Sequence, residues 1–356
     1  MARADRRMLA AGLIAVGVAA ASAPATGQAA PSPHPRSATR QVTISAVGDT
    51  ILGNTPQVPA HPRHYFHDVR GSLTNGVDVV FANLEGTLTT ESDSKCGSSN
   101  GGTCFAFRNP PSFARTFARV GFTVLNNANN HAHDFGSAGL RQTRHAIAAA
   151  GMQHAGMPGE ITYRRVSGIR TAVLGFAPYS NTSNMLHVDA AARLVHDAAQ
   201  HSGVVIVYMH AGAEGSDRQH VTGNEEYYLG EDRGNPKHFA HRMIRAGADL
   251  VLGSGPHVLR GMEFYRHRLI AYSLGNFASY HNFNTSGVLE NSAILRVTLG
   301  PHGGFGSARL VGVRLVGPGR PELQPDSVSM VRRLSKDDFG DSAPRISSKG
   351  RIRPRT

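Results

Sequence analysis

A cluster of amides, imidazoles and one carboxylate between Asn126 and Gly136 contains residue types that bind divalent cations. The segment reads Asn-Asn-Ala-Asn-Asn-His-Ala-His-Asp-Phe-Gly and follows an apolar run, Phe122–Leu125, that predicts a strand. Amide oxygens, imidazoles and carboxylates are all metal ligands, and open α/β sheets build their sites at the carboxyl ends of strands. The structural alternative is a polar turn in which Asp134 caps the next helix.

Other strand-like runs also end in residues that can bind a cation or move a proton. Asp49 follows the run Val42–Val47, and Glu85 follows Val77–Ala82. The remaining ends carry His210 and Glu214 after Val204–Met209, His257 after Leu250–Leu252, and Ser273 and Asn276 after Leu269–Tyr272. One polar strand end means little because loops are polar, but six that use Asp, Glu, Asn and His are hard to explain by turn chemistry alone. If these side chains converge, they form a metal site.

Most of these residues also have an interpretation without metal binding. His131 and His210 can be core histidines whose nitrogens are hydrogen-bonded. Asp49 can cap a turn, and Glu85 can be a solvated loop carboxylate. Glu214 is expected to orient His210 without touching a cation. Ser273 and Asn276 are expected to hold their loop through backbone hydrogen bonds, with Asn276 also able to face a substrate.

The elements that must position these residues alternate between strand-like and helix-like runs. The expected strands are those named above and Thr171–Phe176, and the expected helices are Pro111–Val120, Ala138–Ala150, Ala190–His201 and Pro236–Ala246. Continuously apolar strands that alternate with helices predict an α/β fold with a mostly parallel core. Two later runs, Ala293–Leu299 and Ala308–Val316, have no helix between them and predict an antiparallel pair on a second sheet, joined by a glycine-rich hairpin turn.

The two ends of the chain differ in composition from its middle. Residues 1–30 have a positive start with Arg3, Arg6 and Arg7, a short apolar run and small residues, which is typical of a signal peptide. An uncleaved membrane anchor is the alternative. Residues 31–40 are predicted to be a linker, residues 41–325 a single domain, and residues 326–356 a basic, disordered tail. We therefore expect a secreted or cell-envelope-associated protein.

The 356 residues carry a formal net charge of +12, with much of the excess at the ends. A basic tail favours an anionic envelope polymer or a membrane surface as partner, and no nucleic-acid-binding motif is present. The only two cysteines, Cys96 and Cys104, are expected to form one disulfide in a surface loop. The absence of a Gly-x-Ser-x-Gly elbow and of a lone cysteine argues against covalent catalysis.

The ordered strings GDTILG, NLEGTLT, ANNHAHDFG, HAGAE, GADLVLGSGPHV and AYSLGNF resemble those of the CapA capsule-biosynthesis family. That family is linked to poly-γ-glutamate synthesis and belongs to the calcineurin-like metallophosphatase superfamily. The resemblance implies two facing mixed β-sheets flanked by helices, with a metal centre at the strand ends. It also implies an anionic envelope polymer or a phosphoester as substrate, and membrane-bound synthesis partners.

The resemblance also implies roles for individual residues. The expected metal ligands are Asp49, Glu85, Asn130, His210 and His257, and the expected catalytic residues are His131, as proton donor near a leaving group, and Glu85. Asp134 is expected to support the site from outside the ligand set. Such a ligand set suits one or two ions of manganese, iron or zinc, and two ions can clamp a phosphoryl group and generate hydroxide at neutral pH.

This chain departs from the family pattern at a few positions. Gly255 stands where family members commonly carry the first histidine of His-Pro-His, and Asn54 stands where an arginine often follows the GD string. The superfamily's Asp-x-His start is absent because Ile51 follows Thr50. Two hypotheses therefore remain: a metal-dependent hydrolase of the phosphoesterase type, and a non-catalytic protein that binds or anchors an anionic envelope polymer.

Overall fold

Two β-sheets contain the strands that carry the expected site residues. The structure, a computed structural model, describes residues 40–97 and 104–355. The larger sheet has the order β19-β20-β17-β16-β1-β2-β5-β6, with β15 paired to β1 and β18 paired to β17. Its strands are β1 (Val42–Thr50), β2 (Val79–Leu84), β5 (Val124–Asn126), β6 (Gln153–Ala155), β15 (Asn276–Ala278), β16 (Asn291–Leu299), β17 (Phe305–Val316), β18 (Arg320–Leu323), β19 (Arg345–Ile346) and β20 (Arg351–Arg353).

The smaller sheet has the order β13-β14-β12-β9-β8-β7. Its strands are β7 (Thr162–Val166), β8 (Ile169–Phe176), β9 (Val204–His210), β12 (Leu250–Ser254), β13 (Met262–Tyr265) and β14 (Arg268–Ala271). Two short ladders pair β3 (Thr87–Leu88) with β4 (Arg108–Asn109) and β10 (Tyr227–Tyr228) with β11 (Glu231–Asp232). In the larger sheet β1, β2, β5 and β6 are parallel and form one half, while the other half, from β16 to β19, is antiparallel. In the smaller sheet the central strands are parallel, and the edge strands β7 and β13 are antiparallel to their neighbours.

The two large sheets face each other across a shared apolar core. Ile44 and Phe81 of the larger sheet belong to the same buried cluster as Ile206 and Leu252 of the smaller one. The Phe81 and Tyr208 rings lie 5.2 Å apart between the sheets. A strand alternates its side chains between two faces. The residues next to these core residues along each strand therefore point to the outer face of the sheet, where they pack against helices. The expected fold of two facing mixed sheets is therefore confirmed.

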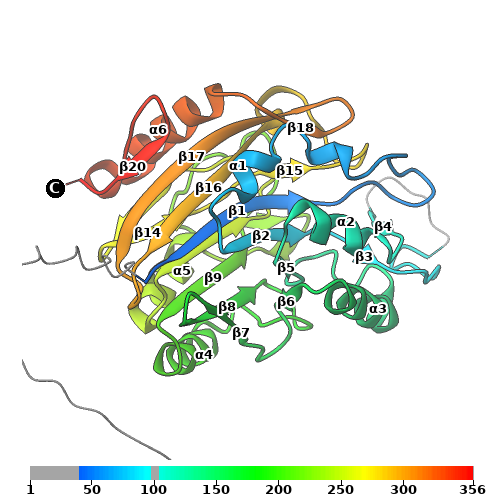
Figure 1. Cartoon of the computed structure of the whole chain (residues 1–356), viewed down its shortest axis with the longest axis horizontal. Helices are drawn as coiled ribbons and strands as arrows, with labels where there is room; N and C mark the ends of the chain where they lie inside the picture. Colours follow the sequence, from blue (N-terminus) through cyan, green and yellow to red (C-terminus); the bar gives the residue numbers. More distant parts are fainter. Residues whose placement is uncertain (1–39, 98–103, 356) are drawn as a thin grey trace, which may run out of the picture. The chain divides into compact units, whose positions relative to one another are not determined.

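Helices cover the outer face of each sheet (Figure 1). The described helices are α1 (Arg70–Thr74), α2 (Phe113–Val120), α3 (Gly136–Ala149), α4 (Val188–Gln200), α5 (Pro236–Ala246) and α6 (Asp326–Phe339), with single 3₁₀ turns at His64–Phe66, Gly287–Glu290 and Gly340–Ser342. Helix α6 differs from the others because it packs against β13 of the smaller sheet and β17 of the larger one. Phe117 of α2 and Ile147 of α3 pack on the larger sheet, whereas Val195 of α4 and Phe239 of α5 pack on the smaller one. Local sequence sets the ends of α5, because Asn235 accepts the His238 amide at its start and Gly247 takes a left-handed conformation at its end.

Two expectations about the strands are corrected. β16 and β17 do pair antiparallel, with the glycine-rich stretch as their turn, but they extend the sheet of β1 instead of forming another sheet. The parallel strands are instead divided between two sheets. β1 also continues to Thr50, beyond the expected end at Val47, because β15 pairs with it at Asp49 and Thr50.

The expectation of a disordered tail over residues 326–356 is wrong for its described part. Residues 326–339 form α6, whose Val328 and Val331 join the core between the sheets. Strands β19 and β20 then extend the larger sheet from β17, and Ile352 between two exposed arginines is buried. The period-2 pattern of Arg351-Ile352-Arg353 is that of a strand with one face on a core.

The remaining expectations about the chain's organisation concern its ends and its cysteines. The predicted signal peptide and residues 31–39 of the predicted linker lie outside the described residues. Cys96 and Cys104 form the expected disulfide, with an S–S distance of 2.07 Å. None of the helices in the described ranges is both long and apolar enough to cross a membrane.

Candidate metal centre

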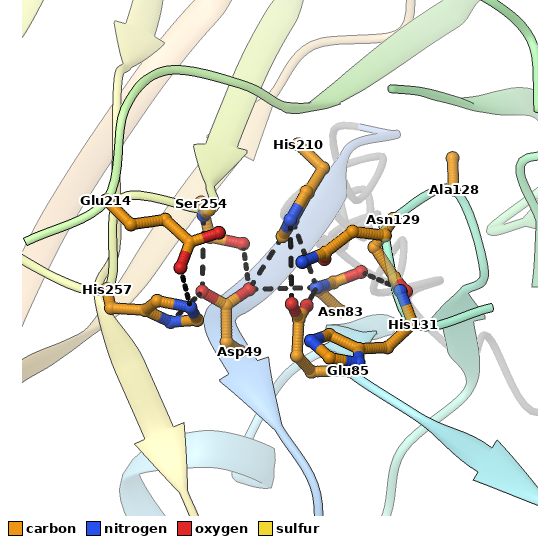
Figure 2. A network of polar contacts seen from close by, with 12 residues as sticks. Asp49, Asn83, Glu85, Ala128, Asn129, His131, His210, Glu214, Ser254 and His257 are labelled. Carbon is orange, nitrogen blue, oxygen red and sulfur yellow. Dashed lines mark hydrogen bonds and ion pairs between the residues drawn. The ribbon is translucent and has the colours of Figure 1, made fainter. Parts of the chain in front are cut away.

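Asp49, Glu85 and His210 converge where the carboxyl ends of strands from both sheets meet (Figure 2). Asp49 lies in β1, Glu85 directly follows β2, and His210 is the last residue of β9. One ligand atom from each residue lies within 4.8 Å of the others. His210 Nδ1 is 3.8 Å from Asp49 Oδ1, and His210 Nε2 is 3.5 Å from Glu85 Oε1. All three side chains are buried.

Two atoms of this group are buried without a hydrogen-bond partner. They are Glu85 Oε1 and His210 Nε2, which face each other. A buried polar atom without a partner is costly, and such atoms in a folded protein point to a missing partner. A carboxylate oxygen and an imidazole nitrogen are both good ligands for manganese, iron and zinc. The residues present therefore fit a divalent cation held by Asp49, Glu85 and His210.

The electrostatics of the group agree with this fit. Burial raises the pKa of Glu85 well above its usual range, and the charge of Asp49 raises it further. Burial lowers the pKa of His210 to about 3, so its imidazole is neutral, which is the state that ligates metals. Burial opposes ionisation of Asp49 as well, but hydrogen bonds from His257 and Ser254 and nearby positive charge lower its pKa to about 2.

Asn83, which the sequence analysis did not single out, lies at the centre of the polar network in Figure 2. Its side-chain amide donates to Asp49 Oδ1 at 2.8 Å and to Glu85 Oε2. Its carbonyl accepts from the amides of Asn126 and Asn129 at 2.7 and 2.9 Å. Asn83 and Glu85 are two residues apart at the end of one strand, so they share a face. The two-residue spacing from Glu85 is the feature of the sequence that could have predicted Asn83 as a site residue.

Asp49 is held by further donors from the end of β12. Ser254 donates its hydroxyl to Asp49 Oδ1, and the Gly255 amide lies 3.2 Å from Asp49 Oδ2. Gly255 has a φ of +117°, a conformation that L side chains rarely adopt. The position at which the sequence resemblance implied a histidine therefore contributes a backbone N–H here and no side-chain ligand.

His257 lies beside this group but both of its ring nitrogens face oxygen atoms. Nδ1 is 2.8 Å from Asn276 Oδ1 and 3.3 Å from Asp49 Oδ2, and Nε2 is 3.5 Å from Glu214 Oε2. Although burial opposes it, these bonds to Asp49 and Glu214 raise the pKa of His257 well above its usual range. His257 thus contacts Asp49, Asn276 and Glu214 in this structure, and its expected role as a metal ligand stays a prediction.

Glu214 makes different contacts from those expected. It was predicted to orient His210, but it accepts from Arg233 at 2.8 Å and faces His257 instead. Ser273 holds its loop, as expected, by donating to the Val258 carbonyl at 2.6 Å.

His131 and Asp134 form a pair within the polar segment Asn126–Gly136, which we call the Asn/His cluster. His131 Nδ1 lies 2.8 Å from Asp134 Oδ2, and both side chains are buried. Asp134 also accepts the Phe107 amide at 2.6 Å. It makes no helix cap, because α3 begins after Phe135 without a side-chain cap bond. The alternative prediction, a polar turn in which Asp134 caps the next helix, is therefore wrong.

Asn130, the expected amide ligand of the cluster, is half-buried and has a side-chain oxygen without a hydrogen-bond partner. No hydrogen bond in the described ranges joins that side chain to Asp49, Glu85 or His210. Its neighbour Asn129 enters the network instead, through Asn83 and through the His131 amide, which Asn129 Oδ1 accepts at 3.0 Å.

Lys95, beside the disulfide, connects the cysteine loop to this cluster. Its ammonium lies 2.7 Å from Asp134 Oδ1 and donates to the Asn130 carbonyl at 3.0 Å. Its backbone amide donates to the Asp134 carbonyl at 2.7 Å. The disulfide loop therefore supplies the cation that faces the buried Asp134 carboxylate.

Methionine in place of Lys95 is expected to lower the free energy of unfolding by about 1–3 kcal/mol, because the buried Asp134 loses its counter-charge. Urea unfolding at neutral pH measures the change. Lys336→Met is the matched control, since Lys336 is exposed and has no ion pair in the described ranges. Equal stability of the two variants would show that Lys95 does not stabilise this cluster.

Comparisons with known proteins give a family and several relatives. The model of a bacterial capsule synthesis protein family, PGA_cap, matches residues 43–281. PGA biosynthesis protein CapA of Bacillus subtilis (strain 168) is 29% identical over 238 residues, which cover 61% of this chain and 58% of that protein. Capsule biosynthesis protein CapA of Bacillus anthracis is 28% identical over 263 residues, covering 67% and 59%. The matches thus span less than two thirds of the length of these relatives.

Among solved structures, a 5'-nucleotidase precursor from Thermus thermophilus is similar with a TM-score of 0.41 and 12% sequence identity. The superposition covers 86% of this chain and 61% of that one.

Proposed function

We propose, on the premise that this chain belongs to the bacterial capsule synthesis protein family, that it is an exported metal-dependent hydrolase in the synthesis of an anionic envelope polymer. The reaction would be hydrolysis of a phosphoester or a related bond. The observation that carries this proposal is the facing pair of partnerless buried ligand atoms, Glu85 Oε1 and His210 Nε2.

Asp49, Glu85 and His210 would hold the cation, and Asn83 would keep both carboxylates in place through its amide. A bound divalent ion would supply Lewis-acid polarisation of the scissile group and a lowered pKa for an attacking water. Asn130 remains a proposed further ligand, supported by its partnerless buried oxygen. His257, whose Nδ1 lies 3.3 Å from Asp49 Oδ2, would orient that carboxylate.

His131 would act as the proton donor to the leaving group. Its Nδ1 is engaged by Asp134, which leaves Nε2 to exchange a proton with substrate. Asp134 and Lys95 would hold the ring in that orientation. Two neighbouring polar groups, Glu214 and Arg233, would complete the rim of the site on the side of His257.

The second candidate function is non-catalytic binding or anchoring of an anionic envelope polymer, such as poly-γ-glutamate. The observation that favours it is Gly255, which offers only a backbone N–H to Asp49 where the sequence resemblance implied a histidine ligand. In this function the same buried group would serve the fold, and membrane-bound synthesis partners would perform the chemistry.

Metal analysis of protein purified without chelator tests the first proposal. We expect bound manganese, iron or zinc, and a phosphoesterase activity that chelation removes and the same metal restores. Metal-free protein that stays inactive with every supplied metal would refute the hydrolase and leave the binding function.

A further inference from the structure

Strand β20 lies at the C-terminal end of the described chain (Figure 1). A concentration of arginine and lysine surrounds it. Arg351 and Arg353 of this strand are exposed on one face, and the buried Ile352 between them points to the core. The two arginines are therefore about 7 Å apart along the strand. With Lys349 they line two separate grooves, one toward β19 and one toward β17.

The first groove has a volume of about 600 Å³ and lies between α6, β19 and β20. Besides the three shared residues, its cationic lining consists of Arg332, Lys336, Arg345 and Arg355. The second groove has a volume of about 940 Å³ and lies against β16 and β17. It adds Arg296 and Arg309. We call the two grooves together the cationic track.

No aspartate or glutamate lines either groove. Within the part of the chain that the structure describes, none of these arginines and lysines forms an ion pair, and all except the half-buried Arg296 are exposed. Like charges gathered without counter-charges repel one another and attract polyanions. The track therefore has the electrostatics of a binding surface for an anion larger than a single phosphate.

The cationic track is distinct from the candidate metal centre. It meets β1 at Thr43, at the start of that strand, whereas Asp49 lies near its end. At about 3.3 Å per residue, six residues of strand separate the two sites by about 20 Å. A ligand can thus occupy the track without touching Asp49, Glu85 or His210.

We propose that the cationic track binds a linear polymer of carboxylate-bearing units. The shared residues Lys349, Arg351 and Arg353 connect the grooves, which suits an extended chain with repeated charges. Arginine guanidinium groups bind carboxylates in bidentate fashion. The choice of a polycarboxylate as the ligand rests on the proposed role in envelope-polymer synthesis. The cationic character of the track is independent of that role, because it follows from the residues that line the two grooves.

Two other polyanionic partners, a membrane surface and a single-stranded nucleic acid, fit the track less well. Membrane-surface binding uses exposed large apolar side chains beside the cations, but the exposed ones in the described ranges lie elsewhere: Phe105, Leu186, Tyr227, Leu229 and Leu323. Single-stranded nucleic acid stacks on aromatic side chains. The one aromatic residue of the grooves, Phe305, is half-buried and packs edge-on against Phe264.

The chain's own first 39 residues are also a poor occupant. That segment contains Asp5 as its single acidic residue, together with several arginines. Charge complementarity therefore favours an external partner.

Binding of fluorescently labelled polyglutamate of defined length to the full chain, followed by anisotropy across about 50–200 mM salt, tests the proposal. The triple variant Lys349→Gln, Arg351→Gln, Arg353→Gln is expected to weaken binding at least about tenfold and to lower the slope of log K against log salt by about 2. A second variant, Arg332→Gln with Lys336→Gln on α6, leaves β20 unchanged and is expected to show a smaller loss in the same direction.

The matched control is Arg119→Gln, Arg141→Gln, Arg193→Gln, which removes the same charge from exposed residues of α2, α3 and α4. It is expected to bind like the unmodified chain. Equal weakening in control and track variants, or absence of binding at low salt, would overturn the proposal. Tighter binding to vesicles of phosphatidylglycerol or to an oligonucleotide of equal charge would overturn the choice of polymer. The assay contains a chelator, so its failure leaves the metal-dependent hydrolase untouched.

Discussion

Glutamine in place of Glu85 is expected to abolish the stabilisation of this protein by Mn²⁺ while leaving the metal-free protein no less stable. Burial and the neighbouring Asp49 raise the pKa of Glu85 well above its usual range, which favours the neutral acid over the carboxylate in the metal-free chain. Glutamine has the same shape and is also neutral. It can occupy the place of Glu85 beside Asn83, but it contributes no charge to a cation.

Thermal unfolding with and without Mn²⁺ measures both halves of this expectation. The unmodified chain should gain about 2.7 kcal/mol at a metal concentration one hundred times the dissociation constant, and its phosphoesterase activity should depend on the metal. The Glu85→Gln variant should show neither effect. Glu225→Gln is the matched control, because Glu225 is exposed and forms no ion pair in the described ranges. Full Mn²⁺ stabilisation of Glu85→Gln would remove Glu85 from the ligand set.

Asparagine in place of His131 is expected to lower kcat roughly 100- to 10,000-fold, the usual range for a lost general acid, with Mn²⁺ stabilisation retained. The reason is that proton transfer and metal binding are assigned to different residues of the site. His131 is bonded to Asp134 through Nδ1 and is absent from the group formed by Asp49, Glu85 and His210. Removal of the ring should thus remove proton transfer and leave the cation in place.

Steady-state kinetics with a phosphoester of good and one of poor leaving group gives a sharper readout. The loss for His131→Asn should be smaller with the good leaving group, which needs less protonation. His145→Gln, on the exposed side of α3, serves as control. Equal losses with both substrates, or loss of the Mn²⁺ effect, would assign His131 a structural or metal-binding role.

Much of the fold could be predicted from local patterns, because strands buried on both faces appear as short apolar runs and helices as periodic ones. The expected helix Pro236–Ala246 has those bounds in the structure, and strand Val204–His210 differs by one residue. The division of the parallel strands between two sheets was not visible locally, since each strand is apolar whichever sheet it joins. The prediction of a disordered tail from Asp326 was wrong because it rested on the high content of charged residues. It gave no weight to the few apolar residues that are buried, Val328, Val331 and Ile352.

The candidate site shows a similar division. Asp49, Glu85 and His210 were identified because each follows an apolar strand, and a parallel strand presents its end to the site. Asn83 was not predicted as a site residue because asparagine is common in loops, and one at the end of an apolar run is typical of the start of a loop. Asn129 and Asn130 are adjacent in a polar turn, and local sequence cannot decide which of their side chains enters the network.

The sequence by itself determined the inventory of this protein: apolar strands, the chemical groups at their ends, the disulfide and the excess of positive charge. These are properties of short segments, so they follow from composition and periodicity. Only the tertiary structure decided which groups meet. Asn83 and His210 are 127 positions apart and come from different sheets. They become neighbours because the sheets pack face to face, and that packing also brings His257 to Asp49. The pairing of β20 with β17 gathers the cations of the track.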